Sequence, residues 1–128
     1  MDANEIDTMP AGRNLDALVA EKAFGTTVVW VRGNVFREDK TALYPDLVCN
    51  MVHQFSTDIA SAWRIVNAVG DSFYHVKRLR DGGYEAAFVC GIGSDASVSV
   101  SLADTAPLAI CRAALKLFER MQLTIRLD

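Results

Sequence analysis

Basic side chains are the residues of this sequence whose spacing best suits the binding of a small anion. Arg112, Lys116 and Arg120 follow one another at intervals of four residues, which places them in one row along a helix. Like charges at this spacing repel each other by a few tenths of a kcal/mol, so an anion, Glu119 or a partner chain would stabilise the row. The alternative is that cations near a helix C-terminus suit the helix dipole. Arg112 fits this alternative least, because it lies in the first half of the predicted helix.

A second group of cations consists of Arg78 and Arg80. They lie on one face of a predicted strand beside an Asp-Gly-Gly turn. A guanidinium can bind phosphate through two parallel hydrogen bonds, and an aromatic ring can stack on a nucleobase. The alternative is that these charges guard a solvated hairpin edge. The predicted ligand-binding residues are therefore Arg78, Arg80, Arg112, Lys116, Tyr84 and Trp30.

No combination of residues specifies a catalytic or metal site. The two histidines, His53 and His75, lack further ligands at metal-binding spacing. A nucleophilic pair of Cys90 and His75 is conceivable, but the apolar neighbours of the cysteine favour a core position. Residues 91–95 contain two glycines but lead into a strand pattern, which indicates a turn rather than a phosphate-binding loop. We expect no enzyme activity, no metal and no cofactor.

The composition is typical of one globular domain spanning residues 1–128. Hydrophobic residues make up 51% and charged residues 23% of the chain, enough for one core without disulfides or metals. The net charge of −3 disfavours binding to nucleic-acid polymers. Three cysteines without paired spacing, and the lack of a signal peptide or a long apolar run, predict a cytoplasmic protein that does not enter a membrane.

The first third of the chain is predicted to contain one helix and one strand. Residues 1–9 form a polar leader that is expected to be flexible. Helical spacing of apolar residues predicts a helix over residues 11–24. A β-branched and aromatic run predicts a strand over residues 26–32, ended by Gly33 and Asn34. Residues 37–54 give no clear pattern, and their structure is left open.

A second helix is predicted to begin after a cap at Ser56 or Thr57 and to end at Gly70. Arg64 and Asn67 are expected to point outward. The apolar stripe expected to face the core consists of Ile59, Ala62, Trp63, Val66 and Val69.

The last half of the chain carries the strongest local signals. Residues 73–80 and 84–90 flank Asp-Gly-Gly, which predicts a hairpin. Residues 96–102 alternate apolar side chains with serines, which predicts a half-buried strand whose serine face meets solvent or a partner. A final helix is predicted over residues 105–121. Its apolar side chains cover about half of its circumference, so we expect this helix to be deeply packed or to lie at an oligomer interface.

These elements predict an α/β (α+β) fold, a mainly antiparallel sheet flanked by helices in a single domain. Three segments, at residues 15–22, 55–63 and 103–115, resemble in order and spacing the phage ABA-sandwich domain family of tailed phages and prophages. The most specific of them reads Ala-Asp-Thr-Ala-Pro-Leu-Ala-Ile-Cys-Arg-Ala-Ala-Leu. The resemblance implies helices on both sides of a sheet and implies no particular chemistry.

The resemblance also suggests a function by analogy with small phage proteins. The size and build of the chain are similar to anti-defence sponges, which sequester the cyclic nucleotide or cyclic ADP-ribose signals of systems such as Thoeris and CBASS. We expect a non-enzymatic phage protein that binds such a signal, with homo-oligomerisation favoured by the last helix. The alternative is a protein-interaction module, either a virion-assembly accessory or a direct inhibitor of a host protein.

Overall fold

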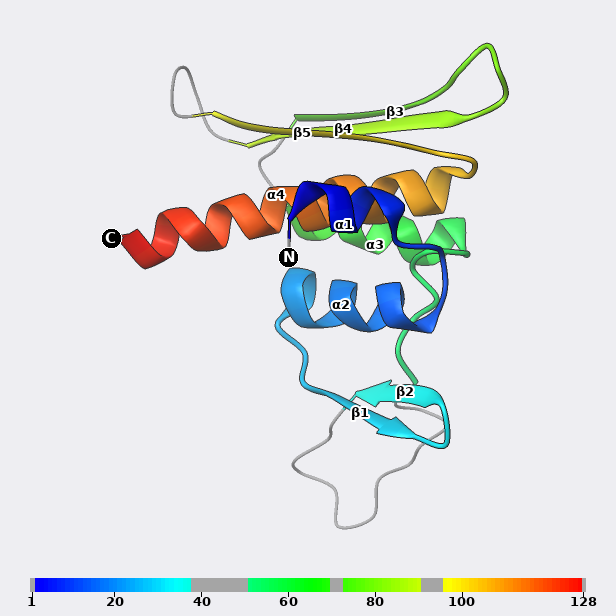
Figure 1. Ribbon diagram of the computed structural model, residues 1–128, viewed down its shortest axis with the longest axis vertical. Coiled ribbons are helices and arrows are strands. Elements are labelled where there is room, and N and C mark those ends of the chain that lie inside the picture. Colours follow the sequence, from blue (N-terminus) through cyan, green and yellow to red (C-terminus); the bar gives the residue numbers. More distant parts are fainter. Residues whose placement is uncertain (1, 38–50, 70–72, 91–95, 128) are drawn as a thin grey trace.

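A computed structural model describes residues 2–37, 51–69, 73–90 and 96–127 (Figure 1). Within these residues the chain forms four helices and two antiparallel sheets of two and three strands, which confirms the predicted α+β class. The two sheets lie at opposite ends of the molecule with the helices between them, so all described helices lie on one side of the three-stranded sheet (Figure 1). The helices on both sides of a sheet that the resemblance implied are thus not observed among the described residues. None of the described helices is long and apolar enough to cross a lipid bilayer.

The three-stranded sheet contains β3 (Phe73–Arg78), β4 (Tyr84–Cys90) and β5 (Ser97–Ala103) in the order β3-β4-β5. The predicted hairpin between β3 and β4 is confirmed, with Arg78 paired to Tyr84 at its end. Its turn depends on Gly82, whose φ of 92° favours glycine. The turn predicted at residues 91–95 lies outside the described residues.

The two faces of β5 are the reverse of the sequence prediction. Ser99 and Ser101 are buried at 2% exposure, whereas Val98, Val100 and Leu102 are 44 to 57% exposed. The inner face of β5 lies against α4 (Ala106–Leu127), which supplies the bulky core side chains itself. Small serine side chains leave room for this helix, so the apolar side chains of β5 point away from the core.

Helix α4 is the central element of the core. Its residues Ile110, Cys111, Leu115 and Leu117 are at most 2% exposed, which confirms that the helix is deeply packed. Burial raises the pKa of the Cys111 thiol, as expected for an inert core cysteine. The part of its wide apolar face between Ala109 and Leu117 is thus covered by the chain itself.

The N-terminal leader departs from the expected flexible segment, because it forms helix α1 (Ala3–Thr8). The Asp2 carboxylate caps the helix by accepting a hydrogen bond from the Glu5 N–H at 2.8 Å. Ile6 is only 1% exposed and belongs to the core. One buried side chain thus ties this short polar segment to the domain.

Helices α2 (Arg13–Phe24) and α3 (Ile59–Val69) lie where the sequence predicts them. Asp58, rather than the predicted Ser56 or Thr57, caps α3 by accepting hydrogen bonds from the N–H and hydroxyl of Ser61. The predicted apolar stripe of α3 is partly wrong, since Ile59 and Trp63 are 44% and 40% exposed. The buried positions are Ser61, Ala62, Ile65 and Val66, because α3 meets α4 along a face rotated from the predicted one.

The predicted strand at residues 26–32 is observed as β1 (Val28–Val31), and it has a partner that the sequence did not predict. Strand β2 (Asn34–Arg37) pairs with it in an antiparallel hairpin. Arg32 and Gly33 form the turn with φ angles of 51° and 80°, the left-handed pair that favours hairpins. The strand end predicted at Gly33 and Asn34 is therefore a hairpin, in which Gly33 belongs to the turn and Asn34 begins β2.

Candidate functional site

The structure engages Arg112 in backbone contacts. Its guanidinium donates to the Met9 carbonyl from Nε at 3.2 Å and Nη2 at 2.8 Å, and to the Leu102 carbonyl from Nη1 at 3.1 Å. These bonds join α4 to the end of α1 and to β5. Arg112 also borders a shallow depression, which Asp81 and Asp104 line as well. Two carboxylates make this depression a poor place for an anion.

Lys116 and Arg120 continue the same pattern along β5. Lys116 Nζ contacts the Asp7 carboxylate at 3.0 Å and donates to the Val100 carbonyl, and Arg120 donates to the Val98 carbonyl. Four residues of a helix rise about 6 Å and two residues of a strand about 6.7 Å, so the helical row matches alternate carbonyls of the strand. The predicted anion-binding row thus lies along the outer edge of β5.

The remaining predicted residues lie at two ends of the molecule. Arg78 ends β3 and Arg80 follows it in the hairpin turn, both exposed, while Tyr84 is half-buried opposite Arg78. Trp30 lies on β1, in the hairpin at the opposite end (Figure 1). The structure therefore brings Arg78 and Tyr84 together but does not gather the six predicted residues into one site.

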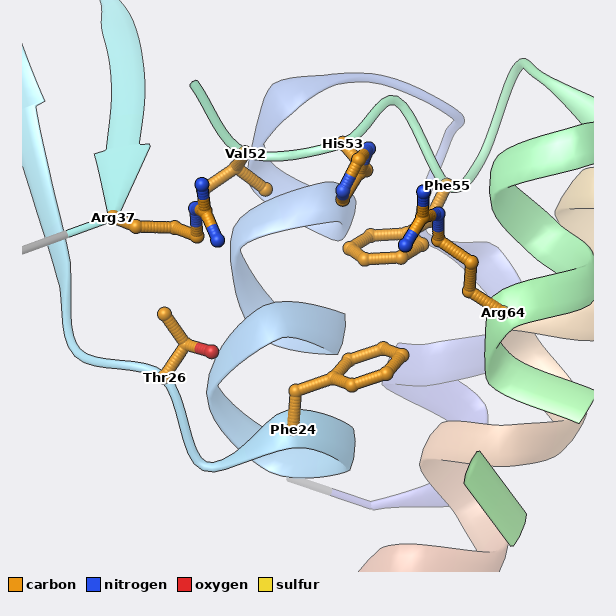
Figure 2. Close-up of a pocket in the computed structure, with 7 residues that line it drawn as sticks. All are labelled: Phe24, Thr26, Arg37, Val52, His53, Phe55 and Arg64. Carbon is orange, nitrogen blue, oxygen red and sulfur yellow. The ribbon is translucent and has the colours of Figure 1, made fainter. Parts of the chain in front are cut away.

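A pocket of about 160 Å³ lies between α2, the β1–β2 hairpin and α3 (Figure 2). Its residues are not among those predicted from the sequence to bind a ligand. We call it the aromatic–arginine pocket. Its lining consists of Phe24, Thr26, Arg37, Val52, His53, Phe55 and Arg64.

Aromatic rings form one wall of the aromatic–arginine pocket. Phe24 ends α2 and Phe55 precedes α3, and their rings stack with centroids 5.3 Å apart and an interplanar angle of 14°. The ring of His53 meets Phe55 edge-on at 5.7 Å. Phe55 is fully buried at 3% exposure while Phe24 is 39% exposed. A rigid buried ring thus positions a second ring that a ligand can reach.

Positive charge dominates the electrostatics of this pocket. Arg37 at the end of β2 and Arg64 on α3 reach into it from opposite sides, with His53 between them (Figure 2). None of its seven lining residues is acidic. Burial, followed by repulsion from Arg64 and Arg37, holds the pKa of His53 below its ordinary value of 6.5, although Asp58 acts in the opposite sense. An anion between the two guanidiniums would relieve this repulsion.

Side chains that could bind a metal ion lie apart in the described part of the chain. Among the described residues, no three His, Cys, Asp or Glu side chains converge as metal ligands. His75 is committed elsewhere, with its Nε2 atom 2.8 Å from the Glu85 carboxylate on the three-stranded sheet. His75 pairs with Ala87, three residues before Cys90, so the conceivable Cys–His pair does not face across the β3–β4 hairpin.

The sequence pattern of the phage ABA sandwich domain matches residues 17–115. The chain belongs to this family. The matched residues of the ABA sandwich domain extend from α2 to the middle of α4 and include the whole lining of the aromatic–arginine pocket.

A solved structure supports the same fold. The ABA sandwich chain is similar to a phage protein from Bacillus cereus ATCC 14579, with a TM-score of 0.59 and 23% identity over 86% of this chain and 93% of that one. At this identity the similarity concerns the fold alone. No curated protein matches the sequence.

Sequence reasoning missed this pocket of the ABA sandwich domain because its residues are far apart in the chain. Phe24, His53 and Arg64 carry no motif, and Arg37 and His53 bound the stretch whose pattern was unclear. The one local signal was the glycine-containing turn at Arg32 and Gly33, which would have predicted β2 and so placed Arg37 opposite Val28.

Proposed function

We propose that this phage-family protein binds a small nucleotide-type ligand in the aromatic–arginine pocket and sequesters it without chemical change. The ligand class is that of cyclic nucleotide or cyclic ADP-ribose immune signals, so that binding would blunt host anti-phage defence. One observation carries the proposal: Arg37 and Arg64 converge on a pocket whose wall is aromatic and whose described lining residues include no carboxylate.

The pocket chemistry favours a ligand with both a planar ring and an anionic group. The exposed part of the Phe24 ring can stack with a base, which contributes about 1–3 kcal/mol in comparable sites. The two guanidiniums suit phosphate. Pockets for whole drug-sized ligands measure about 300–1,000 Å³, so a cavity of about 160 Å³ would enclose one base or phosphate while the rest of the ligand extends outside.

The test is a thermal-shift screen of the full chain with cyclic dinucleotides, cyclic trinucleotides and cyclic ADP-ribose isomers. We expect an upward shift of Tm with one of these classes and recovery of the unmodified ligand after denaturation. Arg64→Gln is expected to weaken binding by about tenfold or more, whereas Arg32→Gln, an exposed arginine outside the pocket, should leave it unchanged. Converted ligand, or binding insensitive to Arg64→Gln, would contradict the proposal.

Binding at this pocket should also depend on pH through His53. An anion near Arg37 and Arg64 offsets their repulsion and raises the His53 pKa from its lowered value, so the complex takes up a proton. Affinity is therefore expected to increase as the pH falls from about 8 to about 6. Isothermal titration in two buffers of different ionisation enthalpy measures this uptake, and His53→Gln should abolish it.

A second candidate function rests on the outer face of β5. Val98, Val100 and Leu102 form an exposed apolar row on the open side of the three-stranded sheet, which favours a protein-interaction module or association of copies of this chain. Sedimentation velocity over a range of concentrations tests self-association through this row. We expect Leu102→Lys to weaken it, and association unchanged by this substitution would exclude the row as the interface.

A further inference from the structure

The two edges of the three-stranded sheet differ in whether other parts of the chain hydrogen-bond to their outward backbone groups. On β5, the carbonyls of Val98, Val100 and Leu102 point to the outer edge and accept hydrogen bonds from the cationic row of α4. A long exposed edge is a template for pairing with other chains, and charged side chains are a common protection against it. The β5 edge is thus covered by the fold.

The β3 edge carries no such cover among the described residues. No described strand pairs with β3 on the side away from β4. The Leu79 N–H donates to the Gly83 carbonyl at 2.7 Å, which makes this a hydrogen-bonded pair of the hairpin. Bonded and non-bonded pairs alternate in antiparallel sheets. The backbone groups of Tyr74, Val76 and Arg78 therefore point outward from the sheet.

The side chains along this edge differ from one end to the other. Tyr74 is 51% exposed and meets Trp63 of α3 edge-on, with ring centroids 5.9 Å apart and Trp63 itself 40% exposed. At the other end, the exposed Arg78 and Arg80 form no hydrogen bond or ion pair with the described residues. Tyr74 and Arg78 lie on the same face of β3, about 13 Å apart along the strand.

We propose that the β3 edge is a docking site for an extended acidic segment of a partner protein, which pairs with β3 as an added strand. Main-chain hydrogen bonds to Tyr74, Val76 and Arg78 would hold the segment. An apolar side chain of the segment would lie against Tyr74 and Trp63. An acidic side chain four residues away would pair with Arg78. This site is separate from the aromatic–arginine pocket and does not depend on the proposed ligand.

Charge decides against a second copy of this chain as the occupant. Residues 73–80 contain Lys77, Arg78 and Arg80 but no acidic residue, and among the described residues only Lys77 of these three has an acidic neighbour, Glu85 on β4 at 3.4 Å. Pairing two copies through β3 would bring the arginines of both copies to one edge, and like charges across a strand pair are destabilising. The same charges attract an acidic segment, so the chemistry of the edge selects a different chain.

Two nine-residue probe peptides test the proposal. Both consist of threonine and serine, with leucine at position 3 and glutamate at position 7 in one and the reverse in the other, because an added strand can run in either direction. The full-length chain is titrated by 1H–15N NMR. We expect saturable shifts with one of the two peptides and slower hydrogen exchange at the backbone amides of Tyr74, Val76 and Arg78.

Charge exchange provides the discriminating control. Arg78→Glu is expected to weaken binding of the glutamate peptide by about tenfold and to strengthen binding of a peptide with lysine in place of glutamate. Arg32→Glu makes the same charge change in the distant hairpin and should change neither. The spectra report directly whether each variant is folded.

Several outcomes would overturn the proposal. These are no saturable binding of either glutamate peptide, shifts that map outside β3, equal binding of the glutamate and lysine peptides, or concentration-dependent protection of the β3 amides without peptide. The last would establish self-association through this edge. None of them concerns nucleotide binding, so failure here leaves the pocket proposal to its own test.

Discussion

Lys116 is a buried cation with a structural task. Its residue is 9% exposed, and its ammonium joins the Asp7 carboxylate of α1 to the Val100 carbonyl of β5. We expect Lys116→Met to lower the free energy of unfolding by about 1–3 kcal/mol, because the Val100 carbonyl loses its donor and α1 loses its ion pair with α4. Urea unfolding measures this change.

Lys22→Met is the matched control for this substitution. Lys22 approaches Glu119 at 3.8 Å, and both side chains are about a quarter to a third exposed. Pairs of this kind contribute about 0–1 kcal/mol. Equal losses of unfolding free energy in the two variants would show that the contacts of Lys116 stabilise the fold no more than an exposed ion pair does.

Asp16 makes the stability of the chain depend on pH. Its side chain, on a residue 4% exposed, accepts hydrogen bonds from the Ser56 N–H at 2.8 Å and hydroxyl at 2.7 Å. Burial outweighs these bonds and raises the Asp16 pKa above its ordinary value of 3.8. The folded state therefore favours the protonated acid, and this contribution is present below pH 3.8 and is lost as the pH rises through the folded-state pKa.

Asp16→Asn removes this titration. We expect the stability of the variant relative to the native chain to improve as the pH is raised from about 4 to about 8. The amide also changes hydrogen bonding, but that effect does not depend on pH. Urea unfolding at several pH values gives the difference, and a constant difference would mean that Asp16 does not titrate as inferred.

At the scale of elements, the two inward-facing serines of β5 differ in their hydrogen-bond partners. Ser101 donates to the Asp7 carboxylate at 3.0 Å, whereas the buried Ser99 hydroxyl has no partner in the described structure. A buried polar group without a partner costs about 1–3 kcal/mol. We expect Ser99→Ala to stabilise the chain by about 1 kcal/mol and Ser101→Ala to destabilise it. Equal effects in thermal unfolding would contradict this difference between the partners of the two hydroxyls.

Helix α1 gives a second element-scale prediction. Ile6 is 1% exposed, so Ile6→Ala should cost about 2–4 kcal/mol through lost burial and the cavity left behind. Glu5→Ala, at an exposed residue of the same helix, provides the control. It leaves the hydrogen bond from the Glu5 N–H to Asp2 in place. Equal unfolding free energies of the native chain and Ile6→Ala would mean that residues 1–9 are the flexible leader that their composition suggests.

At the scale of the whole molecule, α3 separates the aromatic–arginine pocket from the β3 edge: Arg64 lines the pocket, and the adjacent Trp63 contacts Tyr74 of β3. The two side chains have different partners, and sites without shared partners act independently. We expect Arg64→Gln to leave peptide binding at β3 within about twofold, and Arg78→Glu to leave the ligand-induced Tm shift unchanged. A marked effect of either variant on the distant site would reveal coupling through the helices.

The chain itself determined much of this fold through local chemistry. The Asp81-Gly82-Gly83 turn fixed the β3–β4 hairpin, and the apolar half of residues 105–121 fixed a buried helix. The segment at residues 103–115 also carried the resemblance that the family match confirms. These features depend on neighbours in sequence, so periodicity and turn chemistry suffice to find them.

Only the tertiary structure decided which face of each element is buried and which side chains meet. Strict alternation in β5 cannot distinguish its two faces, and α4 made the choice by packing against the serines. Arg112, Lys116 and Arg120 donate hydrogen bonds to β5, and Arg37 and Arg64 line one pocket from different elements. Such contacts join residues distant in the chain, and no local pattern encodes them.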